Sequence, residues 1–403
     1  RMHYGKFSRK ELISRNWWQM KTLREGDAII CDGSIRSGKT ISMTVGFVLG
    51  SMSQFDGQVF AICGKTIESL RRNVILHMPQ WLEGIFSVQE RRSENRVTIA
   101  GLGRRNTYFL FGGKDEGSAA LIQGMPLAGV LFDEVALMPR SFVEQAMARC
   151  SVEGSRYWFN CNPESPAHWF YTEWIKGGQP AKKNALHLHF TMDDNLTLSP
   201  KVRKRYENQY AGVFYDRYIR GAWANADGMV YPDFDPKIHY VSLPQVPVDE
   251  IAKWFVGVDF GWEHYGAMVL LGRTQDGRYY LVKEWAAKHR HIDGWAEIAL
   301  DIKTKLGNIN FYCDAARPDL VQKLREAGIR AIYARKDVLA GISEVASLYK
   351  QRRLFVVREN VQRFQEEIYS YVWKPGADEP VKENDDVQDA VRYAIYSDLK
   401  YGR

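Results

Sequence analysis

The sequence predicts an α/β protein with two successive domains, the first built on a parallel sheet covered by helices. In the first half, short apolar runs rich in β-forming residues alternate with helical patterns, which is typical of such a sheet. In the second half, three strand-like runs come in close succession before the first helix. The chain has 403 residues, 45% of them hydrophobic, and exceeds the size at which one core usually stops growing. We therefore expect two hydrophobic cores.

The predicted strands of the first domain lie between residues 27 and 190. They include residues 28–32, 59–63, 127–133 and 157–161. A segment rich in Gly, Pro, Asp and Tyr at residues 225–247 then breaks the pattern. We place the first domain at residues 1–226 and a linker at residues 227–250.

The second domain is expected at residues 251–403. Its predicted strands cover residues 254–259, 267–271, 279–285 and, after a helix, 310–314. Three consecutive strands followed by further α/β alternation suit a ribonuclease-H-like layout.

The charge balance favours an anionic partner. Lys and Arg number 55 against 48 Asp and Glu, which leaves a net charge of +7 and a pI of about 9.0. The basic residues come in short clusters, such as Arg71 with Arg72 and Lys182 with Lys183. Nucleic acid is therefore the first candidate partner, although any one pair is more typical of solvated surface charge.

Cysteine usage and hydropathy predict a cytoplasmic protein. The five cysteines are scattered and mostly set in apolar runs, which suits free thiols in a reducing compartment. We see no signal-peptide pattern and no apolar run near the roughly 20 residues that span a bilayer.

Residues 33–40 read G-S-I-R-S-G-K-T and match the phosphate-binding loop G-x-x-x-x-G-K-[ST] between an apolar strand and a helical pattern. Backbone N–H groups of such a loop surround phosphates, Lys39 neutralises the β- and γ-phosphates, and the Thr40 hydroxyl ligates Mg²⁺. The sequence thus predicts an ATP site. The expected binding residues are Gly33, Ser34, Ser37, Gly38, Lys39, Thr40 and Asp133.

Two acids end the apolar strand at residues 130–132 and complete the predicted ATP site. Asp133 would hold the Mg²⁺ through water, and Glu134 would polarise the attacking water. An Asp-Glu pair alone is more typical of a solvated strand end, but downstream of a phosphate loop we interpret it as the catalytic pair.

Other polar residues are candidates for contact with the nucleotide. Arg36, inside the loop, is expected to act on the γ-phosphate as an arginine finger supplied in cis; the alternative is a solvated loop arginine. Asn160 or Asn162 would sense the γ-phosphate, unless they serve in capping or a turn. The Trp-Trp-Gln run at residues 17–19 would stack on adenine, although adjacent tryptophans are more often packing residues.

The second half carries a set of aspartates that predicts metal-dependent chemistry. Asp259 and Asp314 end apolar strands, where an acid is costly unless a cation compensates it. Asp385, Asp386 and Asp389 concentrate like charge at the start of a helical pattern, although the first two alone also suit a helix N-terminus. Two strand-end aspartates and a helical one are what two-metal phosphodiester cleavage requires. We expect Asp259, Asp314 and Asp389 to be catalytic, and these three with Asp386 to bind Mg²⁺ or Mn²⁺.

Weaker candidates accompany this set. Glu284, at the end of the third strand of the second domain, is either a further ligand or a surface acid. His289 with His291, and His187 with His189, have no other ligand type beside them, so we interpret them as surface or packing residues.

Several motifs, taken in order, resemble the large terminase subunits of tailed bacteriophages over residues 17–399. They are the loop at residues 33–40, I-Q-G at 122–124, L-F-D-E at 131–134, N-P at 162–163, H-W at 168–169, V-D-F-G at 258–261 and D-A-V-R-Y at 389–393. The resemblance implies a P-loop NTPase domain of the additional-strand type, followed by an RNase-H-like nuclease domain.

The same resemblance implies the partners. Such a subunit translocates double-stranded DNA into a procapsid and cuts concatemeric DNA. It assembles as a homo-oligomeric ring on the portal protein, with monomers in isolation as an alternative, and a small terminase subunit selects the DNA. It would act in the host cytoplasm and at the procapsid, not in the mature virion, and without a membrane. Many relatives carry histidine in the slot of Asp386, which leaves its role open.

Two alternatives explain part of the sequence. A P-loop DNA helicase or translocase without nuclease activity leaves the aspartates of the second domain without a role. A recombinase or junction resolvase with an RNase-H fold leaves Lys39 and Asp133 without a task.

Overall fold

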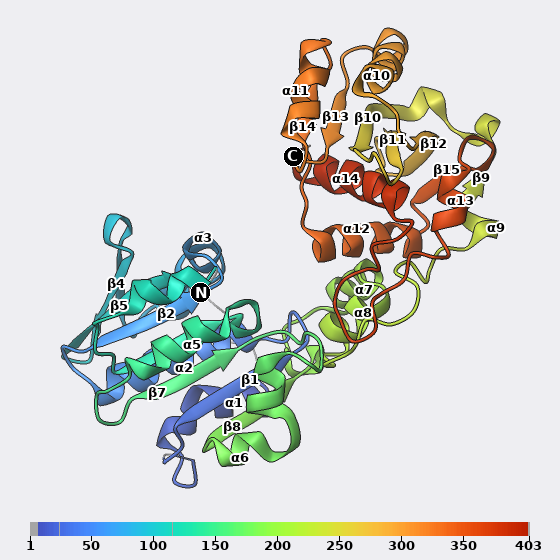
Figure 1. Ribbon diagram of the computed structural model, residues 1–403. Coiled ribbons are helices and arrows are strands. Elements are labelled where there is room, and N and C mark those ends of the chain that lie inside the picture. The colour runs from blue at the N-terminus through green and yellow to red at the C-terminus, as the bar shows by residue number, and fades with distance from the viewer. Residues whose placement is uncertain (1–6, 24, 115, 402–403) are drawn as a thin grey trace. The chain divides into compact units, whose positions relative to one another are not determined.

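The computed structural model describes residues 7–23, 25–114 and 116–401 (Figure 1). The chain divides into two compact units. The first contains residues 1–204 and 215–224, and the second contains residues 205–214 and 225–403. Each unit has its own sheet.

The first unit is built on an eight-stranded sheet with the order β3-β4-β5-β2-β6-β7-β1-β8. Its strands are β1 (Ala28–Gly33), β2 (Val59–Gly64), β3 (Ser87–Arg91), β4 (Arg96–Gly101), β5 (Arg104–Gly112), β6 (Gly129–Asp133), β7 (Arg156–Asn160) and β8 (Ala185–Phe190). All pairs from β5 to β8 are parallel, and only β3 with β4 and β4 with β5 are antiparallel. The predicted parallel sheet is confirmed, and β7 is an additional strand between β1 and β6.

Both faces of this sheet are buried, each in its own hydrophobic core. Successive strand residues point to opposite faces, so neighbouring residues of one strand belong to different cores. Ile29 and Cys31 face one core together with Phe47. Ile30 faces the other core together with Phe142. The helices are α1 (Arg9–Asn16), α2 (Lys39–Gln54), α3 (Ile67–Leu70), α4 (Met78–Trp81), α5 (Arg140–Ala148), α6 (Gln179–Lys182) and, running into the second unit, α7 (Pro200–Gln209).

The second unit contains a seven-stranded sheet with the order β14-β13-β10-β11-β12-β15-β9. The strands are β9 (Tyr240–Val241), β10 (Ile251–Asp259), β11 (Gly266–Thr274), β12 (Tyr279–Ala287), β13 (Asn310–Cys313), β14 (Ala331–Tyr333) and β15 (Leu354–Val357). The predicted strands β10, β11 and β12 pair antiparallel, and the flanking pairs are parallel. The helices are α8 (Gly212–Phe214), α9 (Pro236–His239), α10 (Ile292–Leu306), α11 (Pro318–Glu326), α12 (Val338–Lys350), α13 (Arg363–Glu367) and α14 (Asp386–Tyr401).

Helix α14 lies directly on strand β10, and one glycine permits the contact. A Cβ atom on Gly257 would lie 2.0 Å from the carbonyl oxygen of Ala390 and 2.9 Å from the Cβ atom of Ala394. Because the helix backbone approaches so closely, the first turn of α14 is brought to the end of β10, where Asp259 lies.

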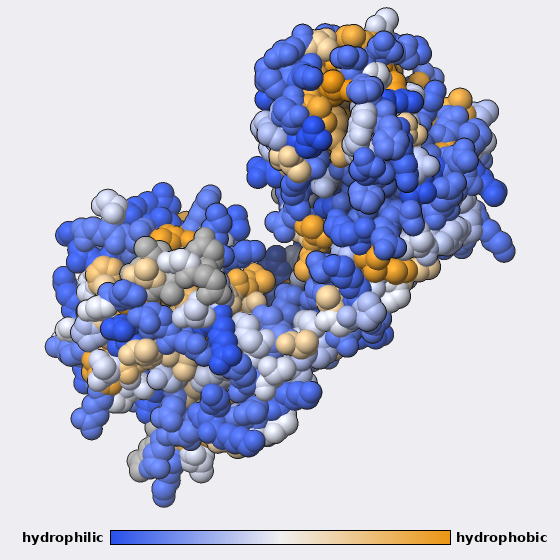
Figure 2. Space-filling view, in the orientation of Figure 1, coloured by the Kyte–Doolittle hydropathy of each residue, from blue (hydrophilic) through white to orange (hydrophobic). Residues whose placement is uncertain are grey.

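No helix within the described residues is long and apolar enough to cross a membrane. On the face shown in Figure 2, hydrophilic residues dominate the surface of each unit and apolar residues form small patches.

Replacement of Gly257 by alanine should destabilise the second unit by roughly 2 kcal/mol, because an added methyl group must push α14 away from β10. Urea denaturation of the Gly257→Ala variant measures this loss. Gly294→Ala is the matched control. Gly294 lies in α10, and an added Cβ atom there meets only the flexible side chain of Arg290. Equal stability of the two variants would contradict the packing argument.

Candidate active sites

The phosphate loop of the first unit is shaped by glycines at both ends. Gly33 has φ 128°, and a Cβ atom there would lie 1.9 Å from the carbonyl oxygen of Phe190 in β8. Gly38 has φ 88° and is the residue before α2. The loop therefore ends at the N-terminus of α2, where free backbone N–H groups favour an anion.

The Lys39 ammonium group is buried inside the loop. Its Nζ donates to the carbonyl oxygens of Ser34 at 2.6 Å and Gly33 at 3.1 Å, and to Oδ1 of Asn162 at 3.0 Å. Burial lowers the pKa of Lys39, and the nearby Glu134 carboxylate opposes that effect. A buried cation at a helix N-terminus is suited to compensate a phosphate.

Two asparagines connect the loop to the predicted acids. Asn160 donates through Nδ2 to Oγ1 of Thr40 at 3.1 Å and to Oδ1 of Asp133 at 2.7 Å. Asn162 donates through Nδ2 to Oε1 of Glu134 at 3.1 Å. Burial raises the pKa of both acids, and the charge of Glu134 raises that of Asp133 further. The end of β6 thus places both acids at the loop, as the sequence indicated, and the end of β7 places both asparagines there.

These residues border a cavity of about 640 Å³. The predicted residues that line it include Arg36, Ser37, Gly38, Lys39, Thr40, Asp133, Glu134 and Asn162. Sequence reasoning missed Arg72, Asn73, His77 and Trp81, which also line it. The basic pair Arg71 and Arg72 was the only feature of the sequence that pointed to this segment. The segment's approach to the phosphate loop depends on tertiary structure, which the sequence pattern does not give.

The Trp-Trp-Gln run does not line this cavity. Trp17 and Trp18 belong to the core between α2 and the sheet, and Trp17 packs edge-on against Trp158 at 5.2 Å between ring centroids. The packing interpretation is therefore confirmed, and stacking on adenine by these rings is wrong.

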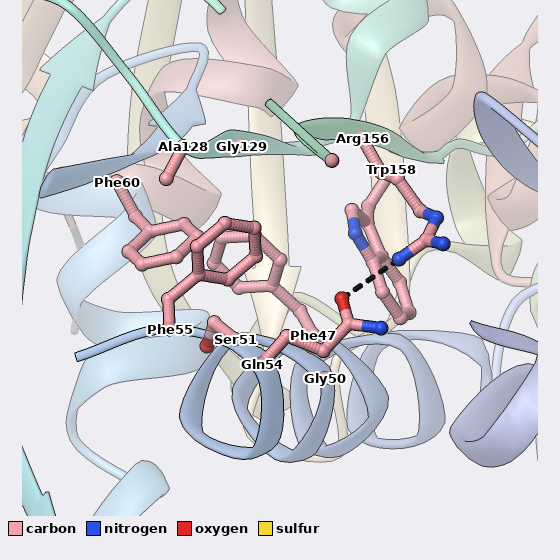
Figure 3. A pocket seen from close by; sticks show the side chains of 11 residues that line it. Phe47, Gly50, Ser51, Gln54, Phe55, Phe60, Ala128, Gly129, Arg156 and Trp158 are labelled. Carbon is pink, nitrogen blue, oxygen red and sulfur yellow. Dashed lines mark hydrogen bonds between the residues drawn. The ribbon is translucent and has the colours of Figure 1, made fainter. Parts of the chain in front are cut away.

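A second hollow under α2 has only about 10 Å³, and Figure 3 shows it enclosed by phenylalanine rings and closed by the Gln54–Arg156 hydrogen bond of 2.7 Å. It is too small for a ligand.

Behind the loop, Asp32 gathers three side chains from two segments. His187 and His189 on β8 contact its Oδ1 at 2.8 and 3.1 Å, and Trp223 donates through Nε1 to its Oδ2 at 2.7 Å. Burial raises the pKa of Asp32, but the hydrogen bonds from both histidines outweigh burial and lower it below its ordinary value. The two histidines therefore support the strand that precedes the loop, a role that their spacing alone did not reveal.

In the second unit, three elements bring the predicted aspartates together. Asp259 ends β10, and Asp314 follows β13, the parallel neighbour of β10. Asp386 and Asp389 lie in the first turn of α14, which packs on β10. Burial raises the pKa of Asp259 well above its ordinary value, and the charges of Asp389, Asp314, Asp386 and Asp385 raise it further. The spacing prediction of one shared carboxylate cluster is consistent with this geometry.

Basic side chains already neutralise part of the cluster. Lys336 forms an ion pair with Oδ1 of Asp314. Lys382 lies 3.2 Å from Oδ2 of Asp389 and 3.3 Å from Oδ2 of Asp385. Oδ1 of Asp389 receives Nη2 of the buried Arg392 at 2.8 Å.

The Asp259 carboxylate, by contrast, has no hydrogen-bond or ion-pair partner among the residues that the structure describes. Within residues 7–23, 25–114 and 116–401, no three acid, histidine or cysteine side chains converge as a metal-binding group. The donor set still fits a hard divalent cation, because it consists of carboxylate oxygens. Lysine ammonium groups already contact Asp314 and Asp389, so a positive charge is accommodated beside these carboxylates.

The weaker candidates have structural roles. Glu284 accepts from the backbone N–H of Gln362 at 2.6 Å and of Phe364 at 2.9 Å, and so binds the start of α13. Because its oxygens are used there, this contact argues against a role for Glu284 as a further metal ligand. His289 and His291 pack on Trp262, with ring centroids 5.4 and 4.8 Å apart, as the packing interpretation expects.

Comparison with protein-family models matches both units. Residues 30–238 match the model described as "Terminase large subunit, T4likevirus-type, N-terminal", and residues 256–397 match "Terminase RNaseH-like domain". A comparison with curated proteins gave no significant match.

Solved structures of one protein from a thermophilic bacteriophage resemble the whole chain. The large terminase of that phage shares 41% sequence identity over 98% of this chain and 99% of its own, with a TM-score of 0.90. Structures of the same phage protein in complex with ATP-gamma-S and with ADP share 40% identity, cover 98% and 97% of this chain and 99% of their own, and have TM-scores of 0.84 and 0.85.

Loss of the Asp32 carboxylate should destabilise the first unit by about 2 kcal/mol, because Trp223 and both histidines lose their acceptor. Urea denaturation of Asp32→Ala measures it, with the exposed Asp27→Ala as control. Since the folded pKa of Asp32 lies below the unfolded one, the difference from wild type should be complete at pH 7 and shrink only below about pH 4. A gap that widens on acidification would refute this account.

Proposed function

The chain belongs to the family of bacteriophage large terminase subunits, and we propose that it uses ATP to drive double-stranded DNA into a procapsid and cuts that DNA with metal ions. Its first unit is the ATPase domain and its second is the RNase-H-like nuclease domain. The observation that carries the proposal is the presence of two separate charged sites in one chain: the phosphate loop with its buried acids, and the aspartate cluster on the other sheet.

In the ATPase domain, the loop backbone from Gly33 to Gly38 would bind the phosphates, and Lys39 would neutralise the β- and γ-phosphates. A bound phosphate would take the place of the loop carbonyls that now accept from its Nζ. The ADP and ATP-gamma-S complexes of the thermophilic phage protein support nucleotide binding by this chain.

Hydrolysis would depend on the acids at the end of β6. Thr40 and Asp133 would hold Mg²⁺, which supplies charge neutralisation for the phosphates when bound. Glu134 would accept the proton of the attacking water, since it lies in the same cavity as Lys39. Its raised pKa suits a group that must take up a proton.

The two asparagines would report the nucleotide state. Asn162 contacts both Lys39 and Glu134, so a γ-phosphate that moves either group also changes the hydrogen bonds of Asn162. Arg36 lines the same cavity and has φ 55°, and the Nδ2 of Asn195 donates to its carbonyl oxygen at 2.8 Å. This place in the cavity wall suits a guanidinium that acts on the phosphates, in the role of an arginine finger supplied in cis.

In the nuclease domain, Asp259, Asp314 and Asp389 would hold Mg²⁺ or Mn²⁺, with Asp386 beside them. The ions supply an activated water and stabilise the leaving oxygen when bound. Asp259 would contribute the central carboxylate, because it is the one whose pKa the other four acids raise. Arg392 would orient Asp389 through its contact at Oδ1.

The proposed partners follow from the family. They are double-stranded DNA, the portal protein of the procapsid, a small terminase subunit and further copies of the chain in a ring. The net charge of +7 supports contact with DNA. The place of action would be the host cytoplasm and the procapsid portal. A helicase without nuclease activity is disfavoured, because residues 256–397 match the terminase RNaseH-like domain.

The two activities should be separable by mutation. Lys39→Ala should abolish ATP hydrolysis, because it removes the charge that neutralises the phosphates. It should leave intact the cleavage of supercoiled plasmid in the presence of Mg²⁺ or Mn²⁺, because the aspartate cluster is unchanged. Asp259→Ala and Asp314→Ala should do the reverse, and EDTA should stop cleavage by wild type. The exposed Asp249→Ala is the control. Loss of both activities in a variant that keeps the wild-type circular dichroism spectrum would refute two independent sites.

The role of Glu134 is tested by the isosteric amide. Glu134→Gln should lower the rate of ATP hydrolysis at least about 100-fold, because the amide cannot accept the proton of the water. Binding of a fluorescent ATP analogue should stay within a few-fold of wild type. Glu144→Gln on the surface of α5 makes the same change away from the loop. Hydrolysis near the wild-type rate in Glu134→Gln would assign the base to another residue.

A further inference from the structure

Two lysines reach the nuclease aspartates from segments outside the sheet. Lys336 follows β14 and pairs with Oδ1 of Asp314. Lys382 precedes α14 and lies between Oδ2 of Asp385 and Oδ2 of Asp389, at 3.3 and 3.2 Å. Neither lysine belongs to a motif that identified the site.

The lysines differ from the third cation of the cluster in their access to solvent. Arg392 is 1% exposed and is held on α14 beside Asp389, so it cannot leave without stranding a buried charge. The Lys336 and Lys382 side chains are 41% and 55% exposed. Because a lysine stem is flexible and its head group is readily hydrated, both can swing into water at little cost.

We propose that Lys336 and Lys382 are displaceable counter-cations, which hold the nuclease aspartates until divalent ions replace them and thereby set the metal concentration at which the site fills. The inference rests on the proposed nuclease function and concerns its regulation.

Competition follows from shared atoms. The lysines contact oxygens of Asp314, Asp389 and Asp385, and the first two of these residues are proposed ligands. An ammonium group and a divalent ion cannot occupy the same side of one carboxylate. Asp259 and the four acids around it repel one another when no cation is present. The lysines relieve that repulsion in the metal-free protein, and the same relief weakens the attraction for metal.

Isothermal titration calorimetry of the full chain with Mn²⁺ at low ionic strength tests the proposal. Lys336→Met and Lys382→Met should each lower the dissociation constant roughly two- to fivefold, and the double variant should lower it further. Lys336→Arg, which keeps the charge, should bind Mn²⁺ as wild type does. Lys374→Met is the matched control: Lys374 is 41% exposed, as Lys336 is, and pairs with Glu379 rather than with an aspartate of the cluster.

A second readout is the melting temperature. In EDTA, Lys336→Met and Lys382→Met should melt below wild type and below Lys374→Met, because the aspartates lose a counter-cation. Addition of Mn²⁺ should raise their melting temperature by more than it raises that of wild type. Unchanged or weaker Mn²⁺ binding in both variants would overturn the proposal.

The Asp259→Asn variant separates this inference from the function on which it rests. The Mn²⁺ binding that Asp259→Asn removes from wild type belongs to the nuclease site, and what remains belongs to the ATPase domain. If Asp259→Asn binds Mn²⁺ as wild type does, the proposed metal site fails. If Asp259→Asn loses binding while the lysine variants match wild type, only the counter-cation proposal fails.

Discussion

Mutual repulsion among the aspartates at the end of β10 is the constraint on which the second unit depends. Asp259 is drawn close to four other acids by strand pairing and by the glycine contact with α14. Such an arrangement is unfavourable for folding, because each buried carboxylate loses hydration and gains like-charged neighbours. The fold tolerates it through the packing of α14 and through three cations, of which only Arg392 is locked in the core. The proposed nuclease site thus lies where the fold gives up stability.

In the ATPase domain the group to be compensated is a buried positive charge rather than a cluster of negative charges, and groups of the chain again compensate it. There a buried ammonium group, Lys39, is held by loop carbonyls and by Asn162 until an anion arrives. In both units, groups of the chain itself satisfy the proposed site, and a ligand would replace them. In both, the compensating contacts are hydrogen bonds and ion pairs that a phosphate or a divalent ion can exceed in strength.

Much of this could be predicted from the sequence, because it is local. The phosphate loop combines its glycines, lysine and threonine within eight consecutive residues, so the motif contains its own geometry. Asp133, Asp259 and Asp314 could be selected as candidates because acids at the ends of apolar strands are rare without a reason. The parallel register of β10 with β13 then brings the two nuclease strand ends together.

What escaped prediction depends on contacts between distant segments. The part that His187 and His189 play beside Asp32 follows from the pairing of β8 with β1, which apolar patterning alone does not specify. Glu284 resembles the other strand-end acids in sequence, yet α13 supplies backbone donors that take both of its oxygens. The part of the wall of the phosphate-loop cavity that contains Trp81 was missed for the same reason. Trp17 and Trp18 suggested a ligand by their chemistry, although their burial against Trp158 makes them core residues.

The contrast between Arg392 and the lysines shows how one cluster can combine order with exchange. Arg392 fixes Oδ1 of Asp389 from within α14, so the carboxylate keeps its orientation whatever happens at its other oxygen. Lys382 occupies that other oxygen from a side chain half in water. A carboxylate held at one oxygen and exchangeable at the other can receive a metal ion without rearrangement of the helix that bears it. Arg392 therefore preorganises the carboxylate ligand, whereas the lysines relieve the repulsion among the aspartates when no metal is bound. A site that must remain folded both with and without metal requires both effects.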